Sequence, residues 1–388
     1  MANDPTARVA ELLQELVGDG TQGPQRGIQA AAYLHGELVV DAWAGMADPA
    51  AGRPVAGDTL FTVYSAGKVI LSTCVHLLAE RGLLDYDAPV AQYWPEFAAN
   101  GKAGVTVRHA LTHRAGIPYL PPGTTPEALC DWEGMCVAVA ALTPLWEPGT
   151  RLGYHAATFG WILGEVVRRV DGRPFGQFVQ EEICAPLDLD GQLYFGIPDA
   201  AEPRVATAEL LAPPPTVPPA PDAPDQQAMP EWMRRIFNRP DVRRACFPAA
   251  GGLMTARALA RHYAALIGAG VGGVRLLPPE RVVAATVPLP DEPDIVWGIK
   301  AAKALGYLLG GPELDAFPAL VGRRHSAFGF PGIGGNIGYA DPEYGLAVAI
   351  LSTGRGVDPK HMVAQRIRAV LGIPEEPAGE QVEARPQC

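Results

Sequence analysis

The chain has 388 residues, 48% of them hydrophobic, so it can bury a large core in one or two domains. Its 31 basic and 42 acidic residues give a net charge of −11, which disfavours nucleic acid and anionic membranes as partners. The chain starts with no basic stretch followed by an apolar one, and it has no apolar run of membrane-spanning length, so we expect a cytoplasmic protein.

The N-terminal part predicts a helix followed by a β-hairpin. Residues 6–18 place Val9, Leu12 and Leu13 on one side of an amphipathic helix. Residues 28–34 and 37–43 are two apolar runs separated by a His-Gly turn, which is the pattern of a hairpin.

A buried helix carrying a serine and a lysine follows the hairpin. An extended apolar stretch ends at Tyr64, and a helical run without proline extends from about Ser65 to Gly82. Ser65 and Lys68 are three residues apart, so they share one face of the first turn. A serine needs a base within hydrogen-bond reach to attack a carbonyl, and burial makes a lysine amine a base by lowering its pKa. The chain has only four serines and five lysines, but spacing alone does not exclude a helix cap beside a solvated lysine. Because the helix is apolar nearly all round and therefore buried, we interpret the pair as functional.

The middle of the chain is mainly helical. We expect helices at 105–112, 126–142 and 159–167, with a Trp-Glu-Pro-Gly turn at 146–149 between the last two. The proline-rich segment at 212–226 excludes helix and central strand, and we interpret it as an insertion rather than a flap over the site. A short amphipathic helix is expected at 231–237.

The C-terminal part is rich in β-structure. A helix at 255–268 is followed by strand character at 295–301 and by two strands, at 336–340 and 346–351, around an Asp-Pro-Glu-Tyr-Gly turn. A last helix is expected at about 359–371.

These elements predict an α+β fold: an antiparallel sheet flanked by helices, with a helical insertion domain and the site between them. Residues 1–64 with 250–372 would form the α/β sheet domain, residues 65–249 the mainly helical domain, and residues 373–388 a mobile tail.

Several ordered motifs carry a resemblance over about residues 6–372. They are Ser65-Ala66-Gly67-Lys68, the stretch Leu111-Thr112-His113-Arg114-Ala115-Gly116, Tyr154 after the 146–149 turn, the Ala-Ala-Gly-Gly-Leu-Met-Thr stretch at 249–255, and the glycine-rich 328–336. Together they resemble the serine β-lactamase and penicillin-binding-protein family, in the class C-like branch that also contains esterases and transesterases. No Gly-x-Ser-x-Gly occurs, so the α/β-hydrolase elbow is not a competitor.

The resemblance assigns roles residue by residue. It implies that Ser65 is the nucleophile, Lys68 its base or proton relay, and Tyr154 the tyrosine of the second motif. A nearby ammonium would ease ionisation of Tyr154, which would take the Ser65 proton and deliver it to the leaving group. The oxyanion hole would be the backbone N–H groups of Ser65 and Ile333.

Two departures from the family pattern bear on the substrate. The second motif has His155-Ala156 where the family often has x-Asn, which weakens any claim to β-lactam turnover. The third motif opens with Phe330 before Pro331-Gly332, where the family usually has Lys or His, sometimes Trp, so no cation is supplied there for a β-lactam carboxylate. We therefore expect a neutral or apolar substrate.

The residues expected to bind it are the following: Phe330, Gly332, His155 and Trp297. For Trp297 a core position is the commoner case, and for His113 and His155 a buried structural role is commoner than a catalytic one.

The leading hypothesis is a serine acyl-enzyme hydrolase that cleaves small-molecule carboxylic esters. The alternatives are an acyltransferase that passes the acyl group to an amine or alcohol, a non-catalytic binding module, and a β-lactamase or peptidase. The six cysteines have no metal-ligand spacing, so no metal or cofactor is expected. The sequence leaves the natural substrate and the oligomeric state open.

Overall fold

The computed structural model describes residues 4–18, 27–209, 227–228, 230–290, 292–298, 300–311, 321–322, 324–354 and 360–374. The proline-rich segment at 212–226 lies outside these residues, as does the tail from residue 375. Within these ranges no helix is both long enough and apolar enough to cross a bilayer.

The strands form two antiparallel sheets. The larger has the order β3-β2-β1-β10-β9-β8-β7, and the smaller has the order β4-β6-β5. Their bounds are β1 (Gly27–Leu34), β2 (Glu37–Asp48), β3 (Arg53–Pro54), β4 (Phe61–Thr62), β5 (Leu193–Phe195), β6 (Gly252–Met254), β7 (Leu308–Leu309), β8 (Phe328–Gly332), β9 (Asn336–Asp341) and β10 (Leu346–Ser352).

The α-helices among the described residues are α1 (Pro5–Val17), α2 (Lys68–Glu80), α3 (Val90–Tyr93), α4 (Val107–Leu111), α5 (Pro126–Leu129), α6 (Trp132–Ala140), α7 (Thr158–Asp171), α8 (Phe175–Val179), α10 (Glu231–Arg235), α11 (Pro240–Arg244), α12 (Ala256–Ala264), α13 (Pro279–Ala285) and α14 (Lys360–Val370). Shorter helical turns that matter for the site are η1 (Tyr64–Gly67) and η6 (Ile333–Gly335).

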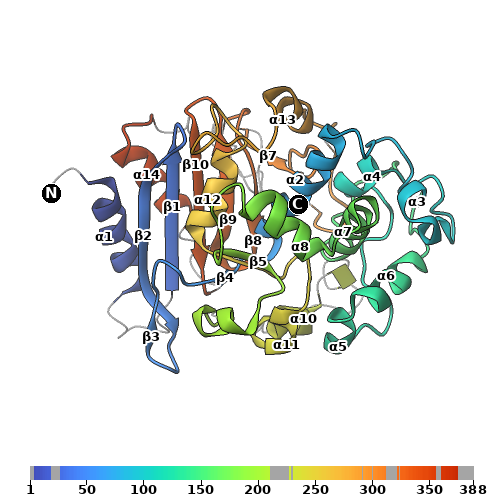
Figure 1. Cartoon of the computed structure of the whole chain (residues 1–388), viewed down its shortest axis with the longest axis horizontal. Coiled ribbons are helices and arrows are strands. Elements are labelled where there is room, and N and C mark those ends of the chain that lie inside the picture. Colours follow the sequence, from blue (N-terminus) through green and yellow to red (C-terminus); the bar gives the residue numbers. More distant parts are fainter. Residues whose placement is uncertain are drawn as a thin grey trace, which may run out of the picture.

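The large sheet joins the two ends of the chain. Ala31 in β1 is paired with Asp41 in β2 on one side and with Ala349 in β10 on the other. Strands β1 and β10 are buried almost throughout, because α1 and α14 cover one face of the sheet and α12 covers the other (Figure 1). The helical part, from α2 to α8, lies beyond α12 on that second side (Figure 1).

This architecture confirms the predicted α+β class, with an antiparallel sheet flanked by helices. The hairpin, the strands on either side of the turn at 342–345, and the first and last helices are also confirmed. The domain boundaries at 64/65 and 249/250 stay a prediction.

Four local predictions need correction. The helix expected from Ser65 begins as the turn η1, and α2 itself starts at Lys68. The helix expected at 126–142 is two helices, because the Asp131 side chain accepts a hydrogen bond from Gly134 N and starts α6 afresh. The helix expected at 105–112 is shorter in the structure, where only α4 is helical and begins after the capping residue Thr106. The strand expected at 295–301 is wrong, since residues 295–297 form a turn and the backbone of Lys300 makes only an isolated bridge with Pro293.

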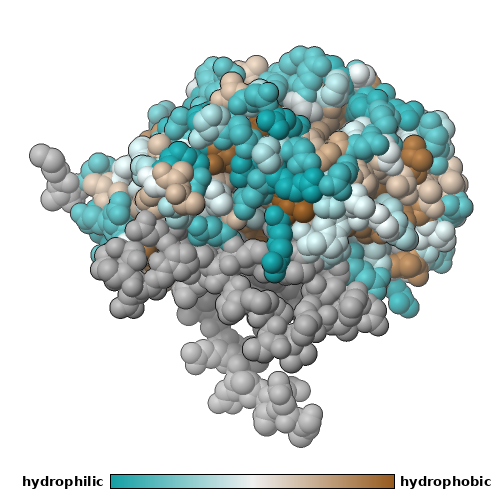
Figure 2. Space-filling model, turned by 90° about the horizontal axis from the view of Figure 1, so that it is seen from below, coloured by the Kyte–Doolittle hydropathy of each residue, from teal (hydrophilic) through white to brown (hydrophobic). Residues whose placement is uncertain are grey.

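The surface seen from below mixes hydrophilic and hydrophobic residues. Figure 2 shows hydrophobic residues in small groups between hydrophilic ones over the coloured part of this face. Five of the cysteines lie among the described residues as free thiols, and the three that are buried pack as small core residues.

Candidate active site

Ser65 lies in a strained turn between the small sheet and α2. Strand β4 leads through Val63 into Tyr64, whose φ is +50°, a backbone conformation uncommon outside glycine. Strain of this kind costs about 1–3 kcal/mol and is found mainly at functional positions. The turn is closed by Ala66 N, which donates to Val63 O. It presents Ser65 with 6% of its surface exposed.

Lys68 is fully buried behind this serine. Its Nζ lies 2.8 Å from Ala156 O, 2.9 Å from Ala249 O and 3.1 Å from Ser65 Oγ. Burial holds the pKa of Lys68 well below its usual range, which favours the neutral amine. Lys68 Nζ is within donor distance of all three oxygens; for the neutral amine, donation to the two carbonyls leaves its lone pair to accept the proton of Ser65.

Tyr154 approaches the same oxygen from another part of the chain. Its hydroxyl donates to Ser65 Oγ at 2.8 Å, and its side chain is buried. Burial raises the pKa of Tyr154, the hydrogen bond with Ser65 opposes this rise, and the Asp294 carboxylate adds to it. The prediction that Tyr154 would ionise easily is therefore wrong: burial outweighs the hydrogen bond with Ser65, and the phenol stays protonated.

The loop around Tyr154 is built from buried polar contacts. Its amide donates to Asp294 Oδ1 at 3.0 Å, while His155 N donates to His113 Nδ1 at 3.2 Å. Both His155 ring nitrogens are also occupied, Nε2 by Ile117 N at 3.1 Å and Nδ1 by Gly153 O at 2.6 Å. Burial lowers the pKa of His155 to about 4. His155 is thus a neutral structural residue of the loop, and these contacts do not support its predicted role in substrate binding.

Two aromatic side chains predicted to bind substrate stack on Tyr154. The Trp297 ring centroid lies 4.0 Å from that of Tyr154, and Trp297 is partly exposed. The Phe330 ring lies 6.2 Å from Tyr154 and is 1% exposed. Phe330 therefore forms the packed floor of the site, while Trp297 stays at its edge.

The glycine at the end of β8 brings the late strand against the nucleophile turn. A Cβ built on Gly332 would lie 2.2 Å from Val63 O and 3.1 Å from Ala66 N. Only a glycine permits this approach, which carries the next residue, Ile333, toward the serine. The end of β8, just before Ile333, thus packs against the turn that carries Ser65, and the oxyanion role of Ser65 and Ile333 stays a prediction.

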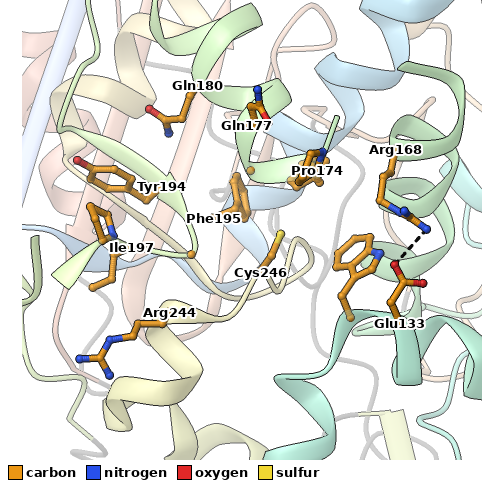
Figure 3. A pocket seen from close by; sticks show the side chains of 15 residues that line it. Glu133, Arg168, Pro174, Gln177, Gln180, Tyr194, Phe195, Ile197, Arg244 and Cys246 are labelled. Atoms are coloured by element: carbon orange, nitrogen blue, oxygen red, sulfur yellow. Dashed lines mark ion pairs between the residues drawn. The ribbon is translucent and has the colours of Figure 1, made fainter. Parts of the chain in front are cut away.

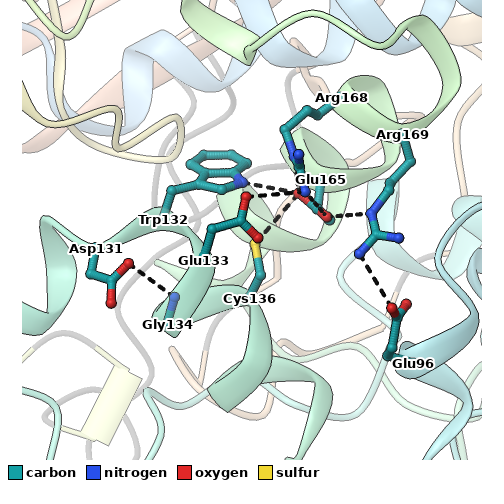
Figure 4. Close-up of polar contacts among 9 residues, drawn as sticks. All are labelled: Glu96, Asp131, Trp132, Glu133, Gly134, Cys136, Glu165, Arg168 and Arg169. Carbon is teal, nitrogen blue, oxygen red and sulfur yellow. Dashed lines mark hydrogen bonds and ion pairs between the residues drawn. The ribbon is translucent and has the colours of Figure 1, made fainter.

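The helix α7 supports the site from the side of Tyr154. Side chains of α6 and α7 meet at the buried carboxylate of Glu165, which accepts from Trp132 Nε1 at 2.9 Å, Arg168 Nε at 2.7 Å and Arg169 Nε at 2.6 Å (Figure 4). Burial alone would raise the pKa of Glu165, but these donors lower it. The network ties α6 to α7, which begins two residues after Ala156, an acceptor of Lys68.

A cavity of about 620 Å³ lies between α6, α7, α8, β5 and the segment before β6, and Trp132 and Arg168 of the Glu165 network are among its lining residues. Figure 3 shows Phe195 and Cys246 among its lining residues. The triad of Ser65, Lys68 and Tyr154 does not line this cavity, so it is not the space in which Ser65 would act.

The arrangement defines a class of protein: a mixed sheet-and-helix fold with a buried Ser-Lys-Tyr cluster between its two parts. The chain belongs to the Beta-lactamase family, whose model matches residues 9–372. It is 38% identical over 349 residues to "Esterase/beta-lactamase LipL" of Mycobacterium tuberculosis (strain ATCC 25618 / H37Rv), an alignment covering 83% of this chain and 75% of that protein.

Two solved structures share the fold. A family VIII carboxylesterase is 34% identical with a TM-score of 0.82, covering 94% of this chain and 96% of that one. A penicillin-binding protein homologue from Caulobacter crescentus is 33% identical, also with a TM-score of 0.82, covering 95% and 97%. The family and these relatives support an enzyme of the serine hydrolase type.

Proposed function

We propose that the protein is a serine esterase that works through an acyl-enzyme on Ser65. The observation that carries this proposal is the position of Ser65 Oγ, 2.8 Å from the Tyr154 hydroxyl and 3.1 Å from the amine of Lys68. Both distances suit proton transfer to and from the serine.

In the acylation step Ser65 Oγ attacks the ester carbonyl carbon. Lys68, held neutral by burial, takes the Ser65 proton, and the carbonyl oxygen becomes an oxyanion. The amides of Ser65 and Ile333 would donate to this oxyanion, and such donors contribute about 3 kcal/mol each. The tetrahedral intermediate then expels the alkoxide, which takes the phenolic proton of Tyr154 as the bond to carbon breaks.

In deacylation the proton transfers of Tyr154 and Lys68 are reversed. The Tyr154 phenolate, stabilised by the new charge on Lys68, takes a proton from the attacking water. The resulting hydroxide adds to the acyl carbon, and the intermediate collapses to the carboxylic acid. Ser65 leaves as its hydroxyl with the proton returned by Lys68, and the site is restored.

The walls of the site favour an ester over a β-lactam. The first position of the third motif is the buried ring of Phe330, which cannot pair with the carboxylate of a β-lactam. The family VIII structure carries carboxylesterase in its name, in agreement with this preference, while the relative LipL is named for both esterase and beta-lactamase.

The test is covalent trapping followed by turnover. Incubation with a p-nitrophenyl ester and measurement of intact mass should give an adduct of one acyl group, which Ser65→Ala abolishes while the fold is kept. A folded protein without an adduct on Ser65 would make it a binding module. Product analysis with and without added alcohol or amine separates hydrolysis from acyl transfer. Faster turnover of nitrocefin than of esters would reverse the substrate assignment.

A further inference from the structure

Asp294 is a buried carboxylate that the proposed chemistry does not use. It lies between α13 and β7 and is fully buried. Its Oδ1 accepts three backbone N–H bonds, from Tyr154 at 3.0 Å, Val296 at 3.0 Å and Trp297 at 3.1 Å. One oxygen atom therefore joins the backbone of the Tyr154 loop to the turn that carries Trp297.

Its other oxygen, Oδ2, pairs with Lys303 Nζ at 2.5 Å, and Lys303 is 3% exposed. A buried ion pair gains little stability over well-packed apolar residues, because both charges lose their water. Stability alone is thus a weak reason for this pair, and its geometry suggests another one. The ion pair with Lys303 fixes the Asp294 carboxylate in the position where its other oxygen accepts the backbone N–H of Tyr154.

Further contacts join the same two segments. Ile295 N donates to Leu152 O at 3.0 Å, and Arg114, next to His113, forms an ion pair with Glu292. Gly153 is enclosed: a Cβ built there would lie 2.7 Å from the Trp146 ring. Residues 292–297 therefore contact both the Tyr154 loop, through Leu152 and Gly153, and the neighbouring segment at Arg114.

We propose that Asp294, anchored by Lys303, is the positioning residue that holds the Tyr154 hydroxyl and the Trp297 ring in register with Ser65. The inference rests on the proposed function, in which Tyr154 protonates the leaving group. Asp294 touches no reacting atom and acts through the backbone of Tyr154.

The charges around this contact agree with the role. The Asp294 carboxylate contributes to the raised pKa of Tyr154, and so helps to keep the phenol protonated for donation. Lys303 balances that charge; its own pKa is lowered by burial and raised again by Asp294. The other titratable groups that face the contact are His113, His155 and Arg114.

The experiment compares two esters of the same acid, an ethyl ester and a p-nitrophenyl ester. Ethoxide needs a proton to leave and p-nitrophenolate does not, so only the first depends on Tyr154 as a general acid. In Asp294→Ala/Lys303→Met the loop loses its acceptor, and kcat/KM should fall about 100-fold for the ethyl ester but less than about 10-fold for the p-nitrophenyl ester. Asp294→Asn/Lys303→Met also lacks the ion pair but keeps an acceptor oxygen, and should recover most of the loss, to within about 5-fold of the wild type.

Asp341→Asn is the matched control. Asp341 is a second fully buried carboxylate, paired with Arg368 Nη1 at 3.0 Å at the end of β9 away from η6. It should lower thermal stability without changing the ratio between the two esters. Equal losses on both esters in Asp294→Ala/Lys303→Met, or no recovery with asparagine in a folded protein, would overturn the inference.

Tyr154→Phe separates this failure from failure of the proposed function. If Tyr154→Phe spares the ethyl ester, the general-acid role is wrong and the inference falls with it. If Tyr154→Phe shows the selective loss and the Asp294→Ala/Lys303→Met variant does not, only the positioning role is wrong.

Discussion

The nucleophile turn at 64–68 and the Tyr154 loop at 152–156 meet at one oxygen atom but are held in different ways. The shape of the turn is set by its neighbours in the chain: Ala66 N donates to Val63 O, and Lys68 follows Ser65 by one helical turn. Its distant contacts, from Lys68 Nζ to Ala156 O and Ala249 O, come after that local geometry has paired the two side chains. The loop is held by Asp294, 140 residues away, and by His113, 42 residues before His155.

The difference also extends to the chemistry. In both regions burial favours the neutral form, but with opposite results: it makes Lys68 a proton acceptor and keeps Tyr154 a proton donor. A local element thus supplies the base, and a long-range one supplies the acid.

The largest effect is expected from removing the base. Lys68→Met replaces a buried amine by an apolar side chain of similar length, so the fold should be kept while kcat/KM for both esters falls about 10⁴-fold. Because the amine must be neutral to accept a proton, wild-type kcat/KM should rise with pH through the lowered pKa of Lys68. The measurement is kcat/KM against pH beside a thermal melt.

Lys68→Arg is the control for this prediction. It places a permanent cation next to Ser65 that cannot lose its proton, so it should be as inactive as the methionine variant. Activity retained in the arginine variant would mean that Lys68 acts as a fixed charge and that the base lies elsewhere.

A smaller effect is expected where β8 meets the turn. Gly332 has extended backbone angles that any residue adopts, so Gly332→Ala tests space alone. The new Cβ would collide with Val63 O and push Ile333 away from Ser65, and kcat/KM should fall about 100-fold, the effect of losing one oxyanion donor. Gly104→Ala, where nothing lies within 4 Å, should leave kcat/KM unchanged. If Gly332→Ala and Gly104→Ala were equally active, the assignment of Ile333 to the oxyanion hole would be wrong.

The sequence predicts the local half of this comparison well. The spacing of Ser65 and Lys68, within an apolar run free of proline, is enough to place both side chains at the mouth of a buried helix. The β1–β2 hairpin and the strands on either side of the turn at 342–345 follow for the same reason, since turn residues and neighbouring apolar runs determine them.

The long-range half could not be predicted in this way. Asp294 stands in a segment whose apolar residues suggested a strand, yet its side chain accepts three N–H groups and the backbone turns around it instead. Nothing in the sequence marks which carboxylate will face Tyr154, because the partner is set by packing. Ionisation of Tyr154 was misjudged for a related reason: spacing shows that a lysine is near but not how far burial neutralises it.

The smallest effect concerns the pH dependence of folding. Burial lowers the pKa of His155 to about 4, so the folded protein keeps this ring neutral while the unfolded chain takes up a proton below about pH 6.5. The unfolded state then binds more protons, and the free energy of unfolding should fall as pH drops from about 6.5 toward 4, by up to about 1.4 kcal/mol per pH unit for this group. His155→Gln should reduce that slope in urea unfolding series, although it also costs stability at pH 7. An unaltered slope in His155→Gln would mean that the His155 ring takes up its proton in the folded protein as it does in the unfolded chain. The pKa of His155 would then not be lowered by burial.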